Sequence, residues 1–89
     1  MQKKEIENLI RKFLMHNNYG IKMLADFDTN ESLLTHGIVD SFGLFAFIAD
    51  LQHAFNIPIE DREIHPGNFE TIENIVRFIY AKKEDEKTQ

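Results

Sequence analysis

The sequence has no cysteine and no tryptophan, and it has only two prolines in 89 residues. Without cysteine the chain can form neither a disulfide framework nor a thiolate metal site, and a reducing compartment is expected. The first residues lack the apolar stretch of a secretory signal, and no apolar run approaches the roughly 20 residues that span a bilayer. These absences predict a cytoplasmic protein without a membrane span.

The charge of the chain is mostly negative and is concentrated in its middle. The formal net charge is −5, and residues 31–70 carry seven acidic side chains against the single basic Arg62. Such a surface repels nucleic acid phosphates and attracts basic protein surfaces. Nucleic acid is therefore excluded as a partner, while a merely solubilising acidic surface stays open as an alternative.

Apolar residues recur at helical spacing in three segments, residues 3–16, 41–55 and 70–82, and no β alternation of useful length appears. A short helical turn is expected at residues 60–64, closed by Pro66 and Gly67. The apolar stripes of the three long segments are Ile6, Leu9, Ile10, Phe13 and Leu14; Leu44, Ile48, Leu51 and Phe55; and Ile72, Ile75, Val76 and Ile79.

Residues 17–39 form a long connection with no sustained periodicity, except for one expected turn near residues 31–34. The connection is too apolar for a free linker, so we expect it to pack along the helices. The prediction is an all-α four-helix bundle with three main helices, one short helix and a long first loop. Residues 1–83 would form the domain, and residues 84–89 a flexible polar tail.

Ser41 stands where the long connection meets the second strong helix. The N–H groups of a first helical turn lack intrahelical partners, and the helix dipole is positive at this end. A phosphate esterified to Ser41 would be stabilised there. From residue types alone, an ordinary helix N-cap at Asp40 or Ser41 is the better explanation, because such caps are far commoner than modification sites.

The segment Asp40-Ser41-Phe42, preceded by Gly37-Ile38-Val39, resembles the attachment motif of acyl and peptidyl carrier proteins. Further segments resemble the family in the same order and spacing: Leu33-Leu34 before the motif, residues 51–59 at the end of the helix that follows, and residues 68–75 at the entry to the last helix. The resemblance covers most of residues 6–82.

The resemblance implies that Ser41 carries 4′-phosphopantetheine, transferred from coenzyme A by a phosphopantetheinyl transferase, with Asp40 assisting the attachment. The thiol of this arm would hold acyl or aminoacyl groups as thioesters for loading and downstream enzymes. Phe42, Phe45 and Asp50 would contact these partners, and Ile59 or Ile64 would line the region where an acyl chain lies. Such a carrier is a monomer and not itself an enzyme.

The chain departs from the family pattern after the serine. Phe42 replaces the commoner Leu or Met, Gly43 stands in the first turn, and the helix keeps only one acidic residue, Asp50. This pattern is more like stand-alone carriers of specialised pathways than a fatty-acid carrier, so fatty-acid enzymes are expected to use it poorly. The apolar stripe of Phe42, Phe45 and Ala49 is either a partner surface or, at Phe45, part of the core. The cargo stays open among fatty acyl, polyketide, aminoacyl and D-alanyl groups.

Other chemistry is weakly supported. Asp40 adjoins Ser41 and cannot easily orient a histidine that faces it, which argues against a catalytic triad with His36 or His53. His16 and His65 complete a scattered set without zinc-site spacing. Residues 26–31 lack the glycine and closing glutamate of a calcium loop. The remaining alternative to a carrier is a helical protein-interaction domain without a prosthetic group.

Overall fold

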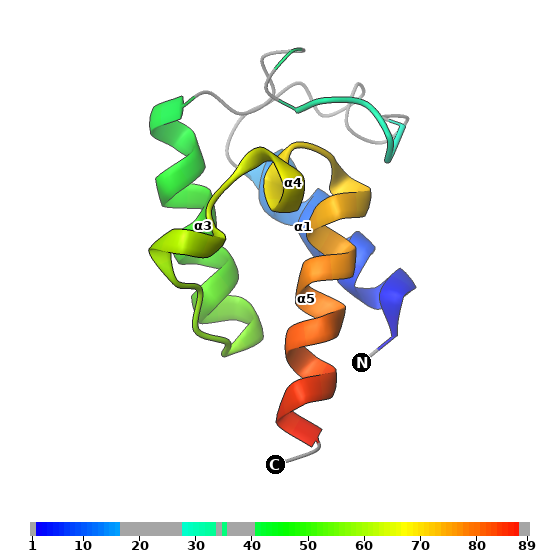
Figure 1. Cartoon of the computed structure of the whole chain (residues 1–89). Helices are drawn as coiled ribbons and strands as arrows, with labels where there is room; N and C mark the ends of the chain where they lie inside the picture. Colours follow the sequence, from blue (N-terminus) through cyan, green and yellow to red (C-terminus); the bar gives the residue numbers. More distant parts are fainter. Residues whose placement is uncertain (1, 17–27, 34, 36–40, 88–89) are drawn as a thin grey trace.

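The computed structural model describes residues 2–16, 28–33, 35 and 41–87, and all the regular secondary structure in this part of the chain is helical (Figure 1). The elements in chain order are α1 (Lys3–His16), α3 (Ser41–Phe55), the 3₁₀ turn η1 (Asp61–Glu63), α4 (Pro66–Phe69) and α5 (Ile72–Lys87). The predicted all-α bundle with three long helices is confirmed. No helix in the described ranges is long and apolar enough to cross a membrane.

The three long helices and the short α4 enclose one apolar core. α5 packs against both α1 and α4, while α3 packs against α1, and Figure 1 shows α3 along one edge of the bundle. The predicted apolar stripes face this core, although Leu9, Phe13 and Leu44 are only partly buried at the margin of the core. Buried core residues are Ile6, Ile10, Leu14, Leu33, Phe47, Ile48, Leu51, Phe55, Ile57, Ile59, Phe69, Ile72, Ile75, Val76 and Ile79.

The end of α3 has a specific local cause. Asn56 follows the last helical residue with φ = 53°, in the left-handed region that asparagine tolerates better than most residues. The N–H of Ile57 then donates to the carbonyl of Gln52 at 3.2 Å, which is the long bond of a Schellman motif. Ile57 is turned into the core by this arrangement. The predicted helix end at Asn56 is confirmed.

The bounds of α5 differ from the predicted 70–82 at both ends. Thr71 is the N-cap, because its Oγ1 accepts a hydrogen bond from the N–H of Asn74 at 3.0 Å. Asn68, three residues before Thr71, donates from Nδ2 to the carbonyl of Glu63. At the other end the helix continues to Lys87, so the predicted helix end at Lys82 was wrong.

The short turn predicted at residues 60–64 is present as η1, but Pro66 and Gly67 do not simply close it. They begin α4, in which Pro66 is the first helical residue and has no N–H that would need a partner. His65 precedes it in an extended conformation, and the N–H of Glu70 donates to the carbonyl of Pro66 at 2.9 Å. α4 places Phe69 in the core, where its ring lies 5.2 Å from that of Phe78.

The described part of the connection is joined to the start of α5 by backbone hydrogen bonds. The N–H of Leu33 donates to the carbonyl of Glu70 at 2.8 Å, and the N–H of Glu73 donates to the carbonyl of Thr29 at 3.0 Å. Leu33 is 1% exposed. The expectation that the connection packs along the bundle is confirmed for these residues; residues 17–27, 34 and 36–39 lie outside the described part.

Glu63 joins η1 to the two helices that follow it. Its Oε1 accepts hydrogen bonds from Lys82 Nζ at 2.8 Å and from the N–H of Glu60 at 2.9 Å, while its carbonyl accepts from Asn68. Burial acts to raise the pKa of the Glu63 carboxyl, but the hydrogen bonds from Lys82 and Glu60 and the charges of Lys82 and Arg62 together lower that pKa below its ordinary value.

The Glu63–Lys82 pair is expected to stabilise the folded chain at neutral pH and to lose this contribution in acid. Because folding lowers the pKa of Glu63, the stabilisation is complete above the unfolded pKa and is lost as the pH falls through the folded one. The free energy of unfolding in urea is measured for the wild type, Glu63→Gln, Lys82→Met and the double variant. The coupling free energy between the two residues should be about 0.5–1 kcal/mol at about pH 7 and nearly zero at about pH 3.

A second cycle on Lys4 and Glu7 serves as the control. This pair is longer, at 3.6 Å, and its lysine side chain is 77% exposed, so a smaller coupling is expected at neutral pH. A coupling between Glu63 and Lys82 that stays constant from neutral pH into acid would contradict the prediction.

Candidate functional site

Ser41 is the first residue of α3, at the junction between the long connection and a helix of 15 residues. The predicted position of the serine at a helix start is therefore confirmed. Asp40, which was expected to assist attachment, lies outside the described residues, and so does the side chain of Phe42. The backbone of Phe42 belongs to the first turn of α3.

The position of Ser41 suits an esterified phosphate. The amide groups of a first helical turn point beyond the N-terminal end of the helix, and the dipole adds partial positive charge there. The first turn of α3 contains no acidic side chain that would oppose an anion. A negative charge at such an end is stabilised by about 0.3–1 kcal/mol. The site is thus compatible with a phosphodiester on Ser41.

Phe45 lies one helical turn after Ser41 and on the same side of α3, because residues four apart are neighbours on a helix surface. Its side chain is 64% exposed, and it is the large apolar side chain that the described part of the chain leaves exposed. Phe47, by contrast, is 2% exposed and belongs to the core. Of the two alternatives for Phe45, the structure excludes burial in the core.

Phe45 belongs to a broader surface that we call the exposed face of α3. It contains one carboxylate and one imidazole among otherwise apolar side chains, and its members are Phe45, Ala46, Ala49, Asp50, His53 and Ala54. This face is turned away from α1, against which α3 packs. The stripe predicted from the sequence included Phe45 and Ala49. That the exposed face of α3 also includes Ala46, His53 and Ala54 is known only from the structure, in which the other side of α3 is buried.

The two residues expected to line an acyl-chain region both pack in the bundle. Ile59 is 8% exposed and belongs to the core, and its N–H donates to Oε1 of Gln52 on α3 at 3.1 Å. Ile64 is half-buried against the same core, just after η1. Both residues therefore lie on the segment that joins α3 to α4. Their role toward an acyl chain stays a prediction.

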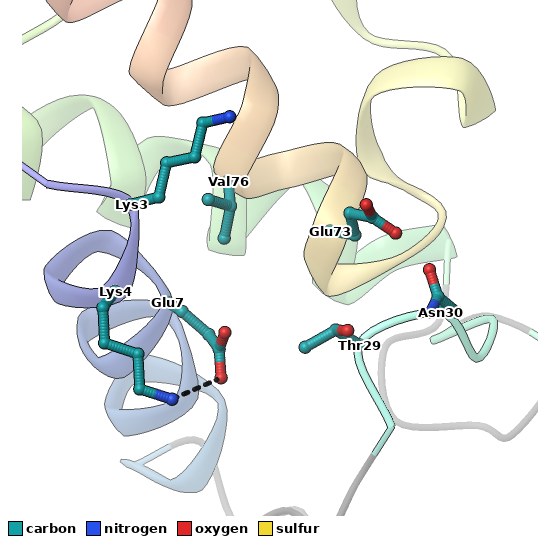
Figure 2. Close-up of a pocket in the computed structure, with 7 residues that line it drawn as sticks. All are labelled: Lys3, Lys4, Glu7, Thr29, Asn30, Glu73 and Val76. Carbon is teal, nitrogen blue, oxygen red and sulfur yellow. Dashed lines mark ion pairs between the residues drawn. The ribbon is translucent and has the colours of Figure 1, made fainter.

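A pocket of about 370 Å³ lies elsewhere, between the start of α1, residues 29–30 and the start of α5 (Figure 2). Its charged groups pair locally, as in the contact of Lys4 with Glu7 and that of Glu73 with Arg77. None of the lining residues comes from α3, so the pocket is separate from Ser41. The lining residues are Lys3, Lys4, Glu7, Thr29, Asn30, Glu73 and Val76.

The described histidines and the acidic turn do not form a metal centre. His53 on α3 and His65 before α4 are both exposed, and no group of three potential ligands occurs within the described ranges. Asp28 Oδ1 accepts a hydrogen bond from the N–H of Asn30 at 2.8 Å, so this carboxylate stabilises a local turn. His36 and the side chain of His16 lie outside the described part.

Comparison with known proteins agrees with the helical fold. No protein-family model matches the chain. Over 83 residues, the chain is 28% identical to the probable acyl carrier protein PigG of Serratia sp. (strain ATCC 39006), and the match covers 93% of this chain and 88% of the Serratia protein. The similarity thus extends over nearly the whole chain, and it is to a protein named as a probable acyl carrier protein.

Proposed function

We propose that the chain is a carrier protein that holds acyl or aminoacyl intermediates as thioesters on a 4′-phosphopantetheine arm attached to Ser41. The observation that carries the proposal is the position of Ser41 as the first residue of α3, within an all-helical bundle. The similarity to a protein named as a probable acyl carrier supports it over nearly the full length. The resemblance of residues 40–42 to the attachment motif of carrier proteins supports attachment of the arm at Ser41.

In this proposal the residues of the chain and the arm have different roles. When bound, the arm supplies a terminal thiol that forms the thioester. Ser41 anchors the phosphodiester, and the first turn of α3 stabilises its negative charge. Asp40 assists the transferase that installs the arm. The flexible tether raises the effective concentration of the cargo at each partner active site. In this proposal the chain itself catalyses no reaction.

The partners are a phosphopantetheinyl transferase, a loading enzyme and the downstream enzymes of a specialised biosynthetic pathway in the cytoplasm. Their contacts are assigned to Phe42, Phe45 and Asp50, of which Phe45 and Asp50 are exposed on α3. Basic enzymes of fatty-acid synthesis bind a row of acidic side chains, whereas this helix has a single carboxylate. This difference supports partner enzymes from outside fatty-acid synthesis. The carrier acts as a monomer.

The wild-type chain is expected to gain the mass of one phosphopantetheine group when it is incubated with coenzyme A and a broad-specificity phosphopantetheinyl transferase. Intact-protein mass spectrometry measures the conversion, and a reaction without transferase is the control. A chain that stays unmodified would overturn the carrier function. It would favour the alternative of an interaction domain in which Ser41 only begins a helix.

A further inference from the structure

The surface of α3 beside Ser41 also specifies the chemistry of the partner. Resting on the carrier function above, we propose that the enzymes acting at Ser41 bind the Phe45 ring in an apolar pocket, so that apolar burial and not ion pairing provides most of the docking affinity. The transferase is the first such enzyme, because it must reach the Ser41 hydroxyl before any other step.

The position of Phe45 places its ring beside the serine that such an enzyme must reach. Four residues of an α-helix rise about 6 Å, and the residue at i+4 lies on the same face as residue i. An enzyme that reaches Ser41 from the side of α3 therefore covers Phe45, whose side chain is 64% exposed. Ala49 continues the same line by one more turn and is also exposed. Its small side chain leaves room for a partner backbone to approach the Phe45 ring.

The charge on α3 fits an apolar partner and not a basic one. Asp50 is the one acidic side chain among the 15 residues of α3, and no lysine or arginine accompanies it. Asp50 stands five residues after Phe45, which is about 140° around the helix at 3.6 residues per turn. The carboxylate therefore lies well around the helix from Phe45, with Ala49 and His53 between them on the exposed face of α3. A complementary enzyme surface has an apolar pocket for Phe45 and at most one cation for Asp50.

Apolar docking and ionic docking respond differently to salt. Charges on exposed surfaces are screened over about 10 Å at 0.1 M salt and over about 3 Å at 1 M. Burial of an aromatic ring is not weakened in this way, and buried aromatic anchors often dominate interfaces. The salt dependence of modification therefore separates the two modes without knowledge of the cargo.

The test measures kcat/KM for modification of the unmodified chain by the broad-specificity transferase at about 50 mM and about 500 mM sodium chloride. For the wild type we expect a change of less than about twofold between these conditions. Phe45→Ala should lower kcat/KM about tenfold, mainly through KM, and Asp50→Asn, which removes the one carboxylate of α3, should have the smaller effect.

A matched pair of variants tests the surface itself. Ala49→Glu places a charge on the exposed face of α3, and Ala81→Glu makes the same change at an exposed position of α5. We expect the first to lower kcat/KM about tenfold and the second to leave it unchanged, with both chains folded by circular dichroism.

The two proposals fail in different ways. Absence of any mass gain on the wild type overturns the carrier function. Modification that falls steeply with salt, or that is insensitive to Phe45→Ala and Ala49→Glu, leaves the carrier function in place and overturns apolar docking.

Discussion

Replacing Ser41 with alanine is expected to abolish attachment of the arm completely. The transferase forms a phosphodiester with a hydroxyl oxygen, and alanine has none to offer. Ser41 is the first residue of α3. Intact-protein mass after incubation with coenzyme A and transferase should show the wild type converted and Ser41→Ala unchanged.

The chain offers a close control for this result. Ser32 is its one other serine, and its Oγ accepts a hydrogen bond from the N–H of Thr35 at 3.1 Å within a turn of the connection. Ser32→Ala should therefore be modified as efficiently as the wild type. Modification that survives Ser41→Ala would refute the assignment of the site while leaving a carrier function possible at another residue.

Replacing Phe55 with alanine is expected to lower the free energy of unfolding by about 3–5 kcal/mol. Phe55 is 1% exposed and is among the largest fully buried side chains of the described chain. Its loss removes apolar burial and leaves a cavity at the end of α3. An 89-residue domain has roughly 5–13 kcal/mol of stability at 0.05–0.15 kcal/mol per residue, so a large part of it would be lost.

Phe45→Ala makes the same chemical change on the same helix and is the control for Phe55→Ala. Because Phe45 is 64% exposed, we expect it to change the free energy of unfolding by less than about 0.5 kcal/mol. Urea unfolding followed by circular dichroism measures both variants. Equal destabilisation by the two changes would contradict the placement of one ring in the core and the other in solvent.

The long helices could be predicted because their boundaries are determined by local sequence. Residues 3–16 and 41–55 have apolar stripes, and the observed α1 and α3 begin and end at the expected residues. The end of α3 at Asn56 depends on a local property, since asparagine tolerates positive φ. Such features need no knowledge of the tertiary structure.

The missed features have two different causes. Pro66 and Gly67 are typical of a turn, but proline also suits the first position of a helix, and this second role produces α4. Residues 83–87 do not continue the apolar stripe, so the periodicity predicts a helix end at Lys82, yet Glu and Lys have good helix propensity and extend α5 to Lys87. In both cases the residue types allowed two structures, and the periodicity of apolar residues could not decide between them.

The candidate site was predictable in position but not in its surface. The junction before residue 41 follows from the periodicity that begins there. Whether Phe45 faces the core or solvent does not, because the answer depends on which side of α3 packs against α1. The role of Glu63 was missed for the same reason, since its partner Lys82 lies far along the chain.

The hydrogen bonds between the connection and the start of α5 have a consequence for the order of folding. The bonds from Leu33 to Glu70 and from Glu73 to Thr29 join segments with α3, η1 and α4 between them in the sequence. Closing so long a loop costs entropy that a single helix does not, so the helices can form before these bonds. We therefore expect these two bonds to form after the helices, and the amide protons of Leu33 and Glu73 to exchange with solvent through openings that leave the helices intact.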